Sequence, residues 1–131
     1  MNTRISPRSE KGQATTEFAV VLPILVVLLF GIIQFGITFK DYLSLTDAVR
    51  AGARKGAVSR ELADPVGATR TAVRNAAADL DQSALPDPDV TSTWDPGTDV
   101  KVSAQYPYKI SLFGIPVMSG FLKSSTTERV E

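Results

Sequence analysis

Hydrophobic and polar positions divide the chain into two unequal parts. Residues 18–39 form one run without a charged side chain, whereas short apolar stretches alternate with charged ones through residues 40–131. A helix made of this run measures about 33 Å at 1.5 Å per residue, enough to cross a hydrocarbon core of ~30 Å. The run therefore predicts a transmembrane helix. The alternative is a buried core helix of a soluble domain, although such stretches are usually shorter.

The charges beside this run predict its orientation. Residues 1–12 carry three basic side chains and one acidic one, and basic residues are retained on the cytoplasmic side of a membrane. We therefore expect a single-pass protein with its N-terminus in the cytoplasm and residues 40–131 outside. A cleaved secretory signal is the rival interpretation, but it has an apolar region of about 7–15 residues followed by a small-x-small site. Residues 34–40 read Gln-Phe-Gly-Ile-Thr-Phe-Lys and show no such site.

The helical period continues beyond the apolar run. Residues 41–58 contain no proline, and five positions spaced by three or four fall on one helix face: Tyr42, Leu45, Val49, Gly52 and Gly56. Ala48, Gly52 and Gly56 also form a ladder of small residues, a spacing that lets another backbone approach closely. This ladder predicts packing against a partner helix or against the protein's own domain. Ordinary use of Ala and Gly in a surface helix would produce the same pattern.

A second helix is predicted to begin at Asp64-Pro65. The Asp side chain can accept hydrogen bonds from the first free amides, and Pro suits the first helical position. An apolar stripe with the helical period follows: Val66, Thr69, Val73, Ala76, Ala77 and Leu80. We expect the helix to end near residues 80–83 and its stripe to cover a small sheet.

Beyond the second helix the period changes to two. Residues 90–94 and 100–106 alternate apolar and polar side chains, and residues 95–98 (Asp-Pro-Gly-Thr) between them have turn chemistry. This pattern predicts a β-hairpin with one buried face, and a third strand is expected over residues 121–130. We interpret the apolar residues 110–118 as a loop that packs within the domain or against the outer leaflet. A dedicated protein-binding site is the alternative.

Composition argues against several classes of function. The formal net charge is zero, so no basic surface for nucleic acid is indicated. The chain has neither Cys nor His, which removes disulfides, the commonest metal ligand and the commonest general base. Its one acidic cluster could bind a hard cation such as Ca²⁺, but Asp beside Pro and Gly is ordinary turn chemistry; the cluster is Asp87, Asp89, Asp95 and Asp99. We therefore expect no enzyme, cofactor, metal or small-molecule substrate.

Short motifs with a recognisable order run along the chain. They are Gly12 followed by Glu17-Phe18, then Leu22-Pro23, residues 31–36 (Gly-Ile-Ile-Gln-Phe-Gly), residues 48–54 (Ala-Val-Arg-Ala-Gly-Ala-Arg), the Val-x-Val-x-x-x-Tyr strand at 100–106 and the closing Thr-Glu-Arg-Val-Glu. This combination resembles the TadE-like proteins, minor pilins or pseudopilins of tight-adherence (Tad, or Flp-type) pili. The expected fold is pilin-like α+β: a long N-terminal transmembrane helix continues into a small extracytoplasmic domain. That domain has a second helix and a roughly three-stranded antiparallel sheet.

The resemblance implies processing. A prepilin peptidase would cleave between Gly12 and Gln13, so residues 1–12 would be a cytoplasmic leader. Residues 13–59 would form the N-terminal helix, including its transmembrane segment, and residues 60–131 the extracytoplasmic domain. Glycine has no side chain to obstruct a protease cleft, which agrees with cleavage at this position.

The resemblance also implies positions for assembly. Glu17 would be the fifth residue of the cleaved chain, next to Phe18, and its carboxylate would attract the new terminal amine of a neighbouring subunit. The simpler interpretation is that Glu17 favours the N-terminus of the helix through the helix dipole. Gln34 departs from the family, in which Glu is frequent there. The implied helix-packing positions are Pro23, Gly31, Gly36, Ala48, Gly52 and Gly56.

The resemblance therefore implies a minor pilin or pseudopilin that assists the assembly or priming of a Tad pilus for surface adhesion. Its expected place is the bacterial cytoplasmic membrane, in the pilus or at its base. The expected partners are the membrane, the prepilin peptidase, other Tad pilins and the pilus assembly platform. The alternative is an unprocessed single-pass membrane protein with an extracytoplasmic binding domain.

Overall fold

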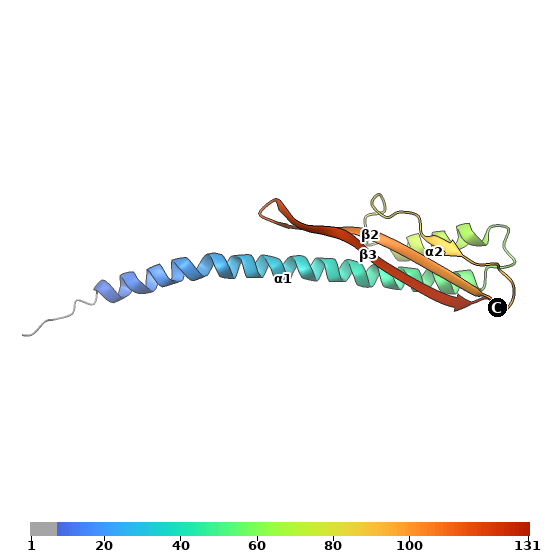
Figure 1. Ribbon diagram of the computed structural model, residues 1–131, viewed down its shortest axis with the longest axis horizontal. Coiled ribbons are helices and arrows are strands. Elements are labelled where there is room, and N and C mark those ends of the chain that lie inside the picture. The colour runs from blue at the N-terminus through green and yellow to red at the C-terminus, as the bar shows by residue number, and fades with distance from the viewer. Residues whose placement is uncertain (1–7) are drawn as a thin grey trace, which may run out of the picture.

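One long helix organises the protein. The computed structural model describes residues 8–131, so most of the predicted leader lies outside the described residues. Helix α1 (Arg8–Ala57) is continuous through 50 residues, including Pro23, and at 1.5 Å per residue it is about 75 Å long. Its first part extends away from the other described elements, and its last part carries them (Figure 1). The predicted continuation of the apolar helix into the domain is confirmed.

The predicted antiparallel sheet is also confirmed. Strands β1 (Asp89–Thr91), β2 (Asp99–Leu112) and β3 (Ile115–Arg129) follow one another in the order β1-β2-β3. Val90 pairs with Val102, and Tyr106 pairs with Leu122. Strand β1 ends at Thr91, earlier than the pattern predicts, and Trp94 has a positive φ of 61°. That conformation ends the extended chain before the turn at residues 95–98.

Residues 110–118 are not a loop, contrary to the sequence-based interpretation. Strands β2 and β3 continue to a two-residue turn at Phe113-Gly114, where φ is 51° and 82°. Positive φ at both central residues is typical of the type I′ turn that closes tight hairpins. The pattern concealed these strands because apolar residues occupy both faces, which removes the alternation, and because Pro116 breaks the expected strand signal.

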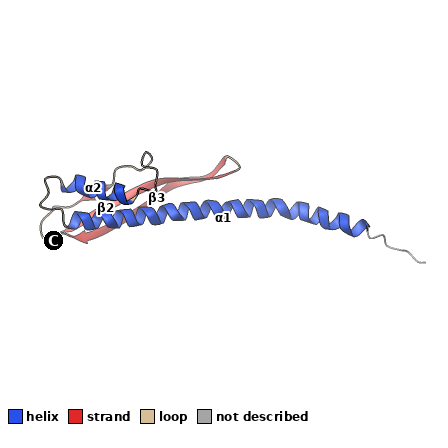
Figure 2. Cartoon of the chain, turned by 180° about the vertical axis from the view of Figure 1, so that it is seen from behind, coloured by secondary structure: helices blue, strands red, loops and turns tan. Residues whose placement is uncertain are grey.

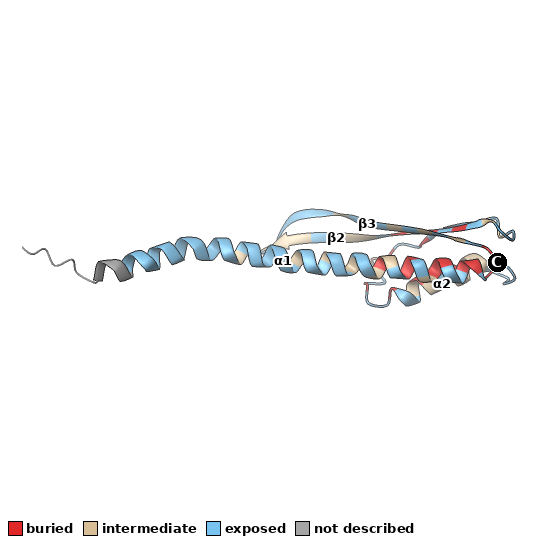
Figure 3. Ribbon diagram, turned by 90° about the horizontal axis from the view of Figure 1, so that it is seen from below, coloured by how far each residue is buried: buried red, intermediate tan, exposed pale blue. Residues whose placement is uncertain are grey.

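The second helix is shorter than its pattern predicts, and its apolar stripe packs mainly on α1 and not, as expected, on the sheet. Helix α2 (Pro65–Ala76) ends before residue 77, and the Gln82 amide donates to the Ala77 carbonyl at 2.6 Å. The stripe packs mainly on α1, and α2 touches the sheet near β1. Figure 2 shows α2 and the sheet along the same end of α1, and Figure 3 shows the sheet on one side of α1 and α2 on the other. Helix α1 therefore covers the sheet in place of α2.

The core lies in the last third of α1, at the end far from the N-terminus. Figure 3 shows the buried residues of α1 gathered there. Buried side chains from α1, from α2 and the chain after it, and from β2 form one cluster: Leu45, Ala48, Val49, Ala53, Val73, Ala77, Leu80, Leu85, Val102 and Ala104. A small domain without disulfides depends on such a cluster for its stability.

Candidate functional site

The predicted cleavage and assembly positions lie in the first turns of α1. The Gln13 side-chain amide donates to the Glu17 carboxylate at 3.2 Å, and the Thr16 hydroxyl donates to the Gly12 carbonyl at 3.0 Å. All four residues, and Phe18 after them, are exposed. The Gly12–Gln13 peptide bond is therefore accessible but helical, and a protease would have to unwind this turn to bind it in an extended form.

The predicted helix-packing positions fall into two groups. A methyl group added at Gly31 or Gly36 would meet nothing within 4 Å in the described chain. At Gly52 the same methyl would lie 2.2 Å from the Val73 side chain, and at Gly56 it would lie 3.1 Å from Thr69 and Val100. Gly52 and Gly56 therefore allow α1 to approach α2 and β2 closely.

Ala48 and Pro23 follow the same division. Ala48 is buried in the core cluster, whereas Pro23 is exposed in the apolar part of α1. The ladder that includes Ala48 is thus used within the protein's own domain. The positions nearer the N-terminus have no packing partner among residues 8–131.

The apolar run of α1 is exposed along most of its length. The segment is long and apolar enough to cross a membrane, and it is unburied by the rest of the described protein. Its large side chains, from Phe18 to Phe39, are mostly exposed. A helix that is apolar all round requires lipid or other protein around it.

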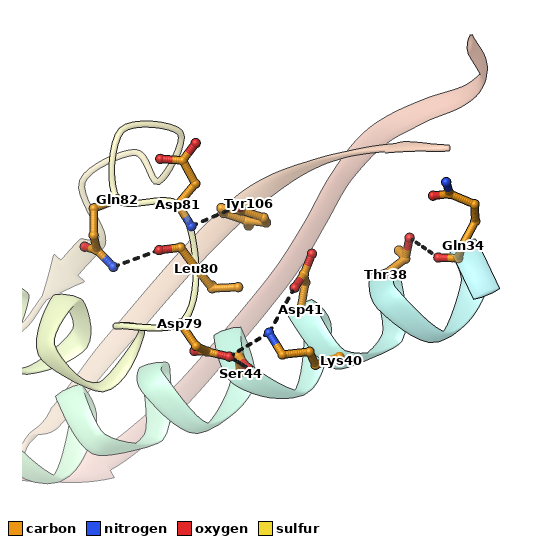
Figure 4. Close-up of polar contacts among 10 residues, drawn as sticks. All are labelled: Gln34, Thr38, Lys40, Asp41, Ser44, Asp79, Leu80, Asp81, Gln82 and Tyr106. Atoms are coloured by element: carbon orange, nitrogen blue, oxygen red, sulfur yellow. Dashed lines mark hydrogen bonds and ion pairs between the residues drawn. The ribbon is translucent and has the colours of Figure 1, made fainter. Parts of the chain in front are cut away.

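The two polar residues of this run lie on the side that faces the hairpin. Gln34 and Thr38 are half-buried, and the Thr38 hydroxyl donates to the Gln34 carbonyl at 3.0 Å. Figure 4 shows them with Asp41 on the side of α1 below strands β2 and β3. The exposed surface of the run therefore carries almost only apolar side chains.

A polar cluster joins α1 to the chain after α2, just beyond the apolar run. The Ser44 hydroxyl donates to the Asp79 carboxylate at 2.6 Å, and the Lys40 ammonium lies 3.1 Å from the same oxygen (Figure 4). The Ser44 hydroxyl and then the Lys40 ammonium lower the pKa of Asp79. The Asp79 carboxylate in turn raises the pKa of Lys40. The charges that first follow the apolar run are therefore used to fasten the domain to the helix.

The hairpin turn reaches the apolar run, a contact that sequence reasoning missed. The Phe113 ring lies 5.2 Å from the Phe30 ring, centroid to centroid, at an angle of 49°. Phe30 is in the middle of α1, well before the core begins. The apolar composition of residues 110–118 was visible in the sequence, but the length and direction of the hairpin were not.

The acidic cluster is dispersed in the structure. The Asp87 carboxylate pairs with the Arg74 guanidinium at 2.6 Å, and this partner lowers the pKa of Asp87. Asp89 begins β1 and Asp99 begins β2, whereas the backbone carbonyl of Asp95 accepts from the Thr98 amide in the turn. Within residues 8–131, no group of three acidic side chains is arranged to hold a metal ion.

Comparison with known families finds a match within α1, over the apolar run and the first part of the buried face that follows it. Residues 12–54 match the family model of TadE-like proteins. The long helix is therefore the part of the chain that is similar to TadE-like proteins. This match confirms the resemblance that the sequence motifs indicate, for residues 12–54. Helix α2 and the sheet lie beyond the match. No curated protein and no solved structure matches the chain.

Proposed function

We propose that this TadE-like protein is a minor pilin or pseudopilin that assists the assembly or priming of a Tad (Flp-type) pilus. The observation that carries the proposal is the exposed apolar part of α1, which lies inside the TadE-like segment. Such a surface needs an apolar environment. A pilin occupies two apolar environments in turn: the membrane before assembly and a bundle of neighbouring helices after it.

The proposal includes processing and a division of the chain. Residues 1–12 are a cytoplasmic leader that a prepilin peptidase removes between Gly12 and Gln13. Residues 13–59 are the assembly helix, and residues 60–131 are the extracytoplasmic domain. The protein resides in the bacterial cytoplasmic membrane, in the pilus or at its base, with other Tad pilins and the assembly platform as partners.

Glu17 and Phe18 are proposed to guide assembly. In this structure the Glu17 carboxylate is exposed and its near partner is the neutral Gln13 amide, at 3.2 Å. Cleavage before Gln13 would place a positive amine at the start of each chain, available to the Glu17 of a neighbouring subunit. Charge pairing is strong where water is excluded, so this pair would favour one register between helices.

The processing proposal is tested by the intact mass and N-terminal sequence of the membrane-extracted protein. The measurement is made in cells with and without an active prepilin peptidase. We expect a chain beginning at Gln13 only when the peptidase is active. A chain that keeps residues 1–12 in both cells would support the alternative, an unprocessed membrane-anchored binding domain.

The assembly role is tested by Glu17→Ala with Glu17→Asp as the matched control. We expect Glu17→Ala to be processed normally but to lose cross-linking to partner pilins, and Glu17→Asp to recover part of it because the charge remains. Unchanged cross-linking and pilus formation in Glu17→Ala would reject the role and leave only the effect on the helix dipole.

A further inference from the structure

The end of the β2–β3 hairpin, residues 110–118, is apolar on both faces and is called the hairpin tip below. It contains no charged residue. Its large side chains are well exposed: Phe113 65%, Ile115 69%, Val117 60% and Met118 56%. Because neighbouring side chains of a strand point to opposite faces, an apolar strand of this kind is expected to be covered on both. Farther along β2 the hairpin is amphipathic, with Val102 buried and Lys101 exposed.

The hairpin tip lies beside the apolar run of α1. Phe113 contacts Phe30, and Figure 1 shows the hairpin running along α1 toward its N-terminal half. From Phe30 to Lys40 the helix rises about 15 Å, and from Phe113 back to Lys109 the strand rises about 13 Å. Lys40 on α1 and Lys109 on β2 are 69 positions apart in the sequence. They nevertheless lie at nearly the same level along the axis of α1, and each is the charged residue next to the apolar part of its element.

The open edge of the hairpin limits how deep the tip can lie in a membrane. Among the described residues β3 pairs with β2 alone, so its other edge carries backbone groups without a strand partner. Such an edge is not tolerated in the hydrocarbon core, but water can satisfy it at the headgroup level. Pro116 removes one N–H from β3. Shallow burial, about 5–10 Å into the boundary between headgroups and acyl chains, satisfies both the apolar side chains and the open edge.

We propose that the hairpin tip is a lipid-contact site that rests on phospholipids of the outer leaflet and sets how far α1 crosses the membrane. This inference rests on the proposed anchoring, with the N-terminus in the cytoplasm. Lys40 and Lys109 lie at the outer edge of the headgroup layer, within reach of lipid phosphates. The Phe113–Phe30 contact places Phe30 just inside the outer boundary.

This placement shifts the membrane-crossing part of α1 toward the N-terminus. The hydrocarbon core is crossed by residues 13–33, about 31 Å of helix, in place of residues 18–39. Gln34 and Thr38 then emerge among the headgroups beneath the hairpin, which explains why the two polar residues of the run lie together at its far end. Glu17 lies about one turn inside the inner boundary.

The chain has no cysteine, so one introduced cysteine reports one position. The full chain is placed in phosphatidylcholine–phosphatidylglycerol vesicles at fewer than one chain per vesicle. An environment-sensitive fluorophore is attached to Val117→Cys in the hairpin tip or to Ser125→Cys, an exposed position on the same strand. Leu25→Cys, an exposed position near the middle of the proposed span, reports membrane crossing itself. Lipids with a nitroxide near the headgroup and aqueous iodide serve as quenchers, and Trp94 emission verifies the fold of each variant.

We expect the label at 117 to be blue-shifted relative to the label at 125. We also expect several-fold stronger quenching by the shallow nitroxide lipid and weaker quenching by iodide at 117. Equal iodide quenching at 117 and 125, with the label at 25 still shielded from iodide, would overturn the lipid-contact site but leave the anchoring intact. Shielding of 117 from both quenchers would also overturn it, because protein would then cover the tip. Iodide quenching at 25 would instead reject the proposed anchoring.

Discussion

The two parts of α1 show opposite relations between hydrophobicity and burial. Residues 18–39 are apolar on every side and are largely exposed, whereas residues 41–57 are mixed in character and hold the buried face. In a soluble protein the more apolar part would be the more buried one. The reversal here indicates that the first part is made for surroundings outside the chain, and the second part for its own domain.

The largest expected change in stability tests the second part of the comparison, the buried face within residues 41–57. Two leucines there, at positions 43 and 45, lie on opposite sides of the helix. Leu45 is fully buried, so Leu45→Ala should lower the free energy of unfolding by about 2–5 kcal/mol. Leu43 is 48% exposed, and Leu43→Ala should stay within about 0.5 kcal/mol. Trp94, the sole tryptophan, reports unfolding of the domain by fluorescence in detergent-solubilised full-length protein. Equal losses in both variants would mean that the domain does not select one face of α1.

A second test places the same substitution in both parts of the helix. Gly52→Ala brings a methyl group against Val73, and overpacking of this kind costs about 1–3 kcal/mol, offset in part by about 1 kcal/mol of better helix propensity. Gly36→Ala meets nothing within 4 Å and should leave the domain's stability unchanged. Denaturant unfolding followed by Trp94 fluorescence separates the two variants. A stabilised Gly52→Ala would contradict the close approach of α1 and α2.

The third test concerns α2, which packs against the buried part of α1. The Asp64 carboxylate accepts from the Gly67 amide at 2.8 Å and caps this helix. Asp64→Ala should lower the free energy of unfolding by about 0.5–2 kcal/mol. The exposed Glu61→Ala, just before the cap, serves as the matched control. A loss in the control as large as in Asp64→Ala would show that charge, and not capping, is responsible.

The smallest expected effect is the pH dependence of the polar cluster where the two parts of α1 meet. The pKa of Asp79 is lowered in the folded protein by Ser44 and Lys40. The ionised carboxylate therefore contributes stability above its usual pKa of 3.8, and this contribution is lost as the pH falls through the lower folded value. Asp79→Asn should reduce the acid-side decrease in melting temperature, and Ser44→Ala should reduce it less. Unchanged acid sensitivity in both would contradict the contribution of this cluster.

Local signals in the sequence predicted most of the elements. The uncharged run, the Asp64-Pro65 start of α2 and the turn at 95–98 each depend on near neighbours in the chain. Such features are set by backbone preferences and by periodicity. The end of α2 was missed because residues 77–80 keep the helical apolar spacing, although the chain there turns to bring Leu80 and Leu85 into the core.

Candidate positions in α1 were also visible from sequence, but their surroundings were not. Gly36 and Gly52 look alike as small residues in one helix, yet one faces open space and the other faces Val73. A spacing pattern states which residues share a face and not what covers that face. The reach of the hairpin tip to Phe30 was missed for the same reason.

By itself, the sequence determined that the chain has a membrane-length apolar helix, a second helix, antiparallel strands and TadE-like motifs, because these depend on composition and short-range order. Only the tertiary structure decided that α1, and not α2, covers the sheet, and that Phe113 lies beside Phe30. Those contacts depend on strand register and on packing between residues far apart in the chain. Each apolar face has several compatible neighbours, and close packing selects among them.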